Sequence, residues 1–134
     1  MLVNLTRARV VARQVAYART FRARLVGLLG RARLTPEEAL VLVPCRSVHT
    51  IGMRFPIDIA FLDREGRVVH LVHNLRPFRF TPVIKKACCA VELPAHRLRD
   101  TGCSLPTPTQ RVWPGPCWKD TKKAQERNPH WKGW

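Results

Sequence analysis

The chain has 134 residues, 46% of them hydrophobic, which is the size and composition of a single folded domain. Lys and Arg number 24 against 9 Asp and Glu, so the formal net charge is +15. This excess attracts anionic ligands and polyanions without selecting among them, and an arginine-rich proteome would produce it as well. The opening residues lack the apolar stretch of a secretory leader, and no apolar run approaches the roughly 20 residues that span a bilayer. We therefore expect a cytoplasmic protein that does not bind membranes.

Residues 1–35 form the most basic block of the chain, and they predict an extended segment followed by a helix. Valine and tyrosine recur at positions 10, 11, 15 and 17, as in a strand at the edge of a sheet. Positions 21, 25, 28 and 29 are apolar at the spacing of one helical face. Thr20 is a typical N-cap for this helix, and Gly30 stands where a left-handed residue would end it. We expect a short amphipathic helix packed on a sheet.

Four further segments predict strands, and they cover residues 39–43, 57–63, 67–73 and 87–93. The turn at 64–66 joins two of these strands as a β-hairpin, in which Gly66 is expected to adopt a positive φ. Strands outnumber helices, and the connections between them are short. The sequence therefore predicts an α+β fold: a small, mostly antiparallel, barrel-like β-sheet domain with one or two short helices.

The composition changes after about residue 102. The segment 103–134 is rich in proline and lysine, contains all four tryptophans, and has no hydrophobic period. We expect a folded domain over residues 1–102 and a C-terminal tail over 103–134 that is poorly ordered or wraps loosely over the domain.

The most distinctive segment, residues 47–63, reads SVHTIGMRFPIDIAFLD. It resembles the signature of the domain of unknown function 192 (DUF 192) family: a turn with an aromatic or histidine residue, Met with a basic residue, then Pro and Asp entering a strand. RLVGLLGR at 24–31 and CAVELPA at 89–95 are similar to the family's earlier helix and late strand. The resemblance covers about residues 15–100 and implies a small β-rich domain, without a known reaction, ligand or cofactor. The family's last Gly-Asp turn is replaced here by GCSLP at 102–106.

Polar and charged residues gather around the glycine turn of this segment, and the candidate ligand-binding residues are Arg46, His49, Thr50, Met53, Arg54 and Asp58. Loops on a rigid sheet are common binding sites. His49 can donate or accept a hydrogen bond, Arg54 can hold a carboxylate or phosphate, and Asp58 can orient either of them. An architectural interpretation stands beside this one, in which Asp58 binds loop amides or pairs with Arg54 to fix the turn.

The sequence does not favour a metal site, a cofactor or a catalytic cysteine. His70 and His73 are three positions apart on a predicted strand and therefore point to opposite faces, and no zinc-type cysteine pair occurs. Cys45 lies near His49, among arginines that would favour a thiolate, but such a cysteine is more often a small buried apolar side chain. The five cysteines are an odd number, and we expect reduced thiols.

Residues 76–80 read RPFRF and alternate cationic and aromatic side chains. This pattern suits stacking on single-stranded bases, and it equally suits a strand with one buried face.

Our preferred hypothesis is a non-enzymatic module that binds an anionic small ligand or peptide at the loop 46–58, with Arg54 and His49 as contacts and Asp58 as their brace. One alternative is a nucleic-acid-binding accessory protein that uses its basic surface non-specifically. Another is a hydrolase or transferase that uses His49 and Asp58. A pocket beside His49 would favour the first or the last hypothesis, and a continuous arginine stripe would favour nucleic acid. The oligomeric state stays open.

Overall fold

The computed structural model describes residues 2–4, 9–18, 20, 28, 31, 33–101 and 112–113. The first strands are β1 (Leu2–Asn4), β2 (Arg9–Ala12), β3 (Gln14–Ala18) and β4 (Glu38–Leu42). They are followed by β5 (Ile57–Leu62), β6 (Val68–Leu75), β7 (Cys89–Pro94), the short helix α2 (Arg97–Asp100) and β8 (Val112–Trp113). Within the described ranges no helix is long and apolar enough to cross a membrane.

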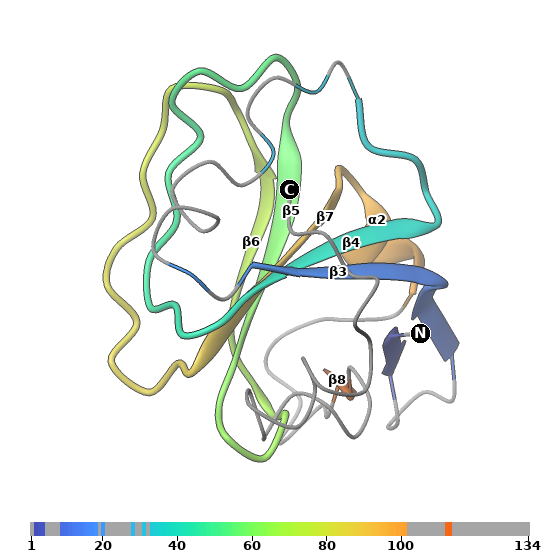
Figure 1. Ribbon diagram of the computed structural model, residues 1–134, viewed down its shortest axis with the longest axis vertical. Helices are drawn as coiled ribbons and strands as arrows, with labels where there is room; N and C mark the ends of the chain where they lie inside the picture. The colour runs from blue at the N-terminus through green and yellow to red at the C-terminus, as the bar shows by residue number, and fades with distance from the viewer. Residues whose placement is uncertain are drawn as a thin grey trace.

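The domain is built on a five-stranded mixed sheet with the order β3-β4-β7-β5-β6 (Figure 1). β3 and β4 run parallel, and the other neighbours in this sheet are antiparallel. A second sheet has the order β2-β1-β8, and both of its pairings are antiparallel. The predicted β-rich, mostly antiparallel domain is thus present, but the barrel-like closure is not confirmed. The five-stranded sheet is open because β3 and β6 lie at its two ends and do not pair with each other.

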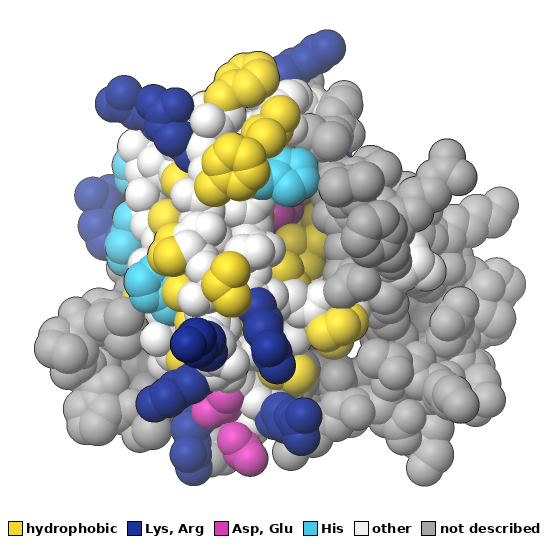
Figure 2. All heavy atoms as spheres, turned by 90° about the vertical axis from the view of Figure 1, so that its left-hand side faces the viewer, with side chains coloured by type: hydrophobic (Ala, Val, Ile, Leu, Met, Phe, Trp, Pro, Cys, Tyr) yellow, Lys and Arg dark blue, Asp and Glu magenta, His cyan; other side chains and the backbone are white. Residues whose placement is uncertain are grey.

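Two long connections lie together on one side of the sheet, the left-hand side in Figure 1 that faces the viewer in Figure 2. They are residues 43–56, between β4 and β5, and residues 76–88, between β6 and β7. Backbone hydrogen bonds join them along their length, from Thr50 N–H to the Arg79 oxygen (2.9 Å) through Ile84 N–H to the Arg46 oxygen (2.8 Å). This paired-loop region carries most of the predicted site residues.

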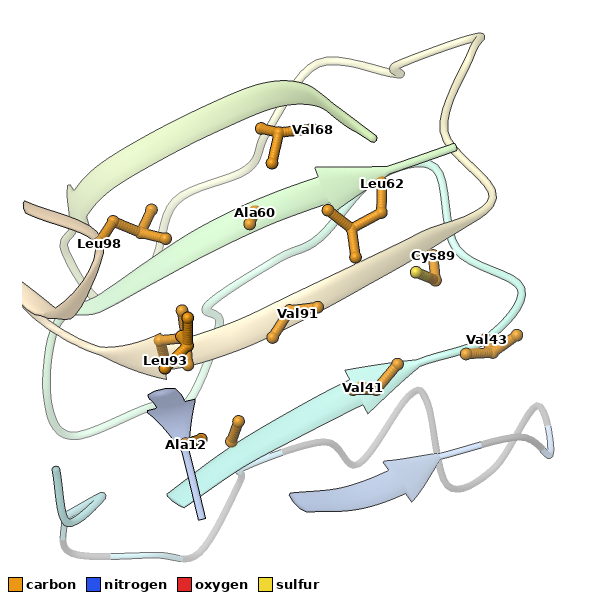
Figure 3. Close-up of a cluster of buried hydrophobic side chains, with 12 residues drawn as sticks. Ala12, Val41, Val43, Ala60, Leu62, Val68, Cys89, Val91, Leu93 and Leu98 are labelled. Carbon is orange, nitrogen blue, oxygen red and sulfur yellow. The ribbon is translucent and has the colours of Figure 1, made fainter. Parts of the chain in front are cut away.

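Both faces of the five-stranded sheet are buried, which explains why its central strands are almost continuously apolar. One cluster contains the alternate β7 residues Cys89, Val91 and Leu93, together with Leu98 from α2 (Figure 3). The opposite cluster contains Leu40, Ile59, Phe61 and Ala90, and it extends to Leu28, Val48 and Met53. The loop that contains Val48 and Met53 is thereby anchored on the sheet.

The four later predicted strands agree with β4 to β7 within a few residues, and the hairpin between β5 and β6 is confirmed. The single extended segment predicted around positions 10–17 is divided between β2 and β3, which belong to different sheets. Gly66 has the predicted positive φ, at 77°. The helix predicted for residues 20–30 lies mostly outside the described residues, although Leu28 on its apolar face is buried. Of the predicted tail, only β8 is described, and it pairs with β1; the boundary at residue 102 stays a prediction.

Candidate functional site

Thr50 fastens the loop 43–56 to the loop 76–88. Its buried hydroxyl donates to the Arg76 carbonyl oxygen (2.6 Å) and accepts from the Arg79 backbone N–H (2.9 Å). The Thr50 carbonyl oxygen also accepts hydrogen bonds from Phe78 N–H (2.9 Å) and Met53 N–H (3.1 Å). A buried hydroxyl that is bonded this completely has little capacity left for a ligand. Thr50 therefore positions the two loops.

Asp58 has a similar architectural role at the start of β5. Its side chain is fully buried, and Oδ1 accepts the backbone N–H of Asn74 (2.8 Å) while Oδ2 accepts that of Leu98 (3.0 Å). The first bond holds the end of β6, where Asn74 has a positive φ of 51°, and the second satisfies an amide in the first turn of α2. Asp58 therefore accepts hydrogen bonds from backbone amides, which is the architectural interpretation of the sequence. Its two bonds are to these amides and not to Arg54.

The remaining predicted residues lie in different environments. Met53 is 5% exposed and belongs to the hydrophobic cluster, so it anchors the turn. Arg54 and Arg46 are both exposed. His49 is half-buried, forms a β-bridge with Phe80, and has its ring centroid 6.4 Å from the Phe80 ring. The structure therefore does not gather these six side chains around one point.

A cavity of about 520 Å³ lies at the Arg46 end of the paired loops. Its charged lining combines Arg46 with Arg64, Lys85 and Lys86, and with the two acids Asp63 and Glu65. In Figure 2 these residue types gather at the lower end of the face, where Lys and Arg side chains surround acidic ones. The sequence analysis missed this cavity because its lining comes from three separated segments, in which Arg46 is the one predicted site residue.

The cavity walls are held by backbone hydrogen bonds. Cys88 N–H donates to the Leu62 oxygen (2.7 Å), and Cys45 N–H donates to the Cys88 oxygen (3.0 Å). At the hairpin, Asp63 Oδ1 accepts the backbone N–H groups of Glu65 and Arg67, both at 2.9 Å. Asp63 is therefore partly committed to shaping its own turn, which leaves the basic side chains to dominate the lining.

Glu92 is the second feature that the sequence analysis did not single out. It lies in the central strand β7, 3% exposed, opposite Leu40 on one side and Ile59 on the other. Burial raises the pKa of its carboxyl to about 8, so the folded protein holds it largely protonated at neutral pH. Two buried polar side-chain atoms of the described region lack a hydrogen-bond partner, Glu92 Oε2 and His49 Nδ1. A charged residue inside an apolar strand was the available sequence signal.

Three cysteines lie in the described residues, Cys45, Cys88 and Cys89, and the last two are free thiols. Burial raises the pKa of the Cys89 thiol well above its usual value, and the neighbouring Cys88 and Cys45 raise it further. The Cys45 thiol donates to the Ser47 oxygen at 3.0 Å. In the part of the chain that the structure describes, no group of three His, Cys, Asp or Glu side chains could hold a metal ion.

Comparison with known proteins identifies a family and a fold. The model of the DUF192 family, described as an uncharacterised ACR, matches residues 3–105. A protein of unknown function from Novosphingobium aromaticivorans has a similar structure, with a TM-score of 0.72 and 24% identity over 84% of this chain and 81% of that one. A candidate transcription regulator from Sinorhizobium meliloti gives a TM-score of 0.67 and 19% identity over 84% and 88% of the two chains. No curated protein matches the chain.

Proposed function

We propose that this chain, which belongs to the domain of unknown function 192 family, is a small binding module for an anionic ligand, with the basic cavity beside Arg46 as its site. The observation that carries this proposal is the convergence of Arg46, Arg64, Lys85 and Lys86 on one cavity of about 520 Å³. A cavity of this volume falls within the range typical of small-ligand sites.

The charge of the lining decides the ligand class. Four cationic side chains face two carboxylates, so an anion gains attraction from the excess, while a cation would be repelled. Arginine offers paired donors to a phosphate or carboxylate, and lysine adds a compact positive charge. We therefore propose a ligand with at least two negative charges, such as a phosphorylated or polycarboxylated small molecule, or an acidic peptide end.

The proposal keeps the predicted ligand class and moves the site. Arg46 is the member of the predicted set that lines the cavity, whereas Thr50, Met53 and Asp58 are occupied by architecture. Both oxygens of Asp58 accept backbone amides in a fully buried position, so the geometry does not favour the alternative in which His49 and Asp58 act as a catalytic pair.

Isothermal titration with inorganic pyrophosphate and with citrate tests the proposal. Replacing Arg46 and Lys85 together with Gln removes two cavity charges, and we expect affinity to fall about tenfold or more, since each lost charged hydrogen bond costs on the order of 1 kcal/mol. The matched control replaces Arg54 and Arg67 with Gln. These exposed residues carry the same charge outside the lining, and we expect a change of about twofold or less.

Two results would contradict the cavity proposal. Equal losses in both double variants would mean that net charge alone attracts the anion. Undetectable binding of either probe at low salt, with the fold intact by circular dichroism, would mean that the cavity is not an anion site.

A further inference from the structure

The large hydrophobic side chains that are exposed in the described part of the chain fall on the paired loops, at Ile51, Phe78, Phe80 and Val83. Phe78 is 64% and Phe80 is 70% exposed. In Figure 2 hydrophobic side chains gather at the upper end of the face, beside a histidine and between basic side chains. Two phenylalanines left this open to water lose the stabilisation that burial would give them, and such exposed apolar groups mark interaction surfaces.

The backbone under these rings is fixed. Phe78 has a φ of 62°, a conformation that is costly for a bulky residue and persists only where its surroundings hold it. The Phe78 N–H donates to the Thr50 oxygen, and the Thr50 hydroxyl accepts the Arg79 N–H, both at 2.9 Å. Phe80 is held by its bridge to His49 and by the ring contact between the two side chains. The backbone that carries the rings therefore has little freedom left to lose on binding.

The charged side chains that flank the rings in the sequence have one sign. Arg76 and Arg79 alternate with Phe78 and Phe80 in sequence, and both arginines are exposed. No Asp or Glu occurs between residues 66 and 91. Arg79 Nη1 donates to the Phe78 carbonyl oxygen at 3.4 Å, so this guanidinium lies beside the Phe78 backbone. The sequence pattern had two interpretations, and the exposure of both rings removes the one with a buried strand face.

We propose that Phe78 and Phe80, flanked by Arg76 and Arg79, form a docking surface for single-stranded nucleic acid. Flat aromatic faces stack on unpaired bases, and guanidinium groups contact the phosphates between them, a combination that tolerates any base sequence. A duplex already stacks its bases on each other and offers the rings no free base face. The net charge of +15 favours a polyanion over a neutral apolar partner. This surface is separate from the proposed anion cavity, whose lining includes none of these four residues.

Fluorescence anisotropy with a labelled oligothymidylate of about 12 nucleotides, and with a duplex of equal length, tests the proposal. We expect the single strand to bind at low salt and the duplex to bind more weakly. Phe78→Ala and Phe80→Ala should each weaken binding roughly five- to a hundredfold, the loss typical of one stacked base. Ile51→Ala and Val83→Ala remove exposed apolar groups that cannot stack, and each should change affinity by about twofold or less.

Three further kinds of variant separate stacking from non-specific apolar or electrostatic binding. Phe78→Tyr and Phe80→Tyr keep an aromatic face and should bind within about threefold of wild type, whereas the matched Leu variants should not. Arg76→Gln with Arg79→Gln should lower the slope of log affinity against log salt by about 1.4.

Several outcomes would overturn the proposal. One is the absence of any anisotropy change at low salt. Another is wild-type binding of the oligonucleotide by the Leu variants, because a side chain without an aromatic face would then serve as well as a ring. A third is equal binding of duplex and single strand that the Phe substitutions leave unchanged, because phosphate attraction alone would then account for it. The substituted side chains are exposed, so thermal unfolding of each variant should match wild type.

Discussion

The buried carboxyl of Glu92 makes the stability of this domain depend on pH in a direction opposite to that of a salt-bridged acid. Below about pH 4.5 the carboxyl is protonated in both the folded and the unfolded chain, and it adds no pH dependence. Between 4.5 and about 8 the unfolded chain ionises this group while the folded protein keeps it protonated, so the free energy of unfolding falls as pH rises. Above about 8 both states are ionised and the loss stays constant.

The size of the effect follows from the two pKa values. A rise from 4.5 to about 8, at about 1.4 kcal/mol for each tenfold change, corresponds to roughly 5 kcal/mol of lost stability at the upper end. Glu92→Gln has nearly the same shape and does not ionise. Between pH 5 and pH 8, the free energy of unfolding of wild type should fall by about 4 kcal/mol relative to that of Glu92→Gln. A constant difference in stability between the two proteins does not affect this comparison.

Urea denaturation of both proteins at several pH values in this range measures that difference directly. All other titrating groups are shared, so their contributions cancel between wild type and variant. If the gap between Glu92→Gln and wild type stays constant to within about 1 kcal/mol, the burial argument for Glu92 is wrong.

Three further substitutions test the architecture. Asp58→Asn replaces one carboxylate oxygen with an NH2 group that would face a backbone N–H. We expect the free energy of unfolding in urea to fall by about 3 kcal/mol. A fall below about 1 kcal/mol would mean that the two hydrogen bonds do not stabilise the fold. Thr50→Val removes the buried hydroxyl between the two loops and should cost about 1–3 kcal/mol, while an unchanged melting curve would contradict its role. Gly66→Ala forces a Cβ into a positive φ and should cost about 1–2 kcal/mol in thermal unfolding, and a neutral effect would show that the turn can rearrange.

The sequence predicts the strands well where local chemistry decides them. Residues 39–43 and 57–63 are apolar runs bounded by proline or a turn, and they become β4 and β5. The parallel pairing of β3 with β4 was not predictable in this way, because side-chain alternation does not reveal which strand is the neighbour. The strand order, which leaves β3 and β6 as the two edges of an open sheet, is set by such pairings.

The site was harder to predict for a related reason. Thr50 and Asp58 were recognised as important polar residues, but their partners lie 26 and 40 positions away at Arg76 and Leu98, so the sequence could not separate architecture from binding. The basic cavity is likewise made by three segments that only the fold brings together. Glu92 was visible as a charged residue in an apolar strand, but its burial depends on Leu40 and Ile59 beside it.

The two hydrogen bonds of Asp58 also bear on the order in which the domain folds. The bond to Asn74 spans 16 residues and closes within the β5–β6 hairpin, whereas the bond to Leu98 spans 40 residues and needs β7 in place beside β5. Closing a longer loop costs more entropy, and contacts distant in sequence form later on average. We expect the hairpin to form early and α2 to dock late, which kinetic comparison of variants at β6 and α2 would reveal. The Asp58 carboxylate thus connects a hairpin that we expect to form early with a helix that we expect to dock late.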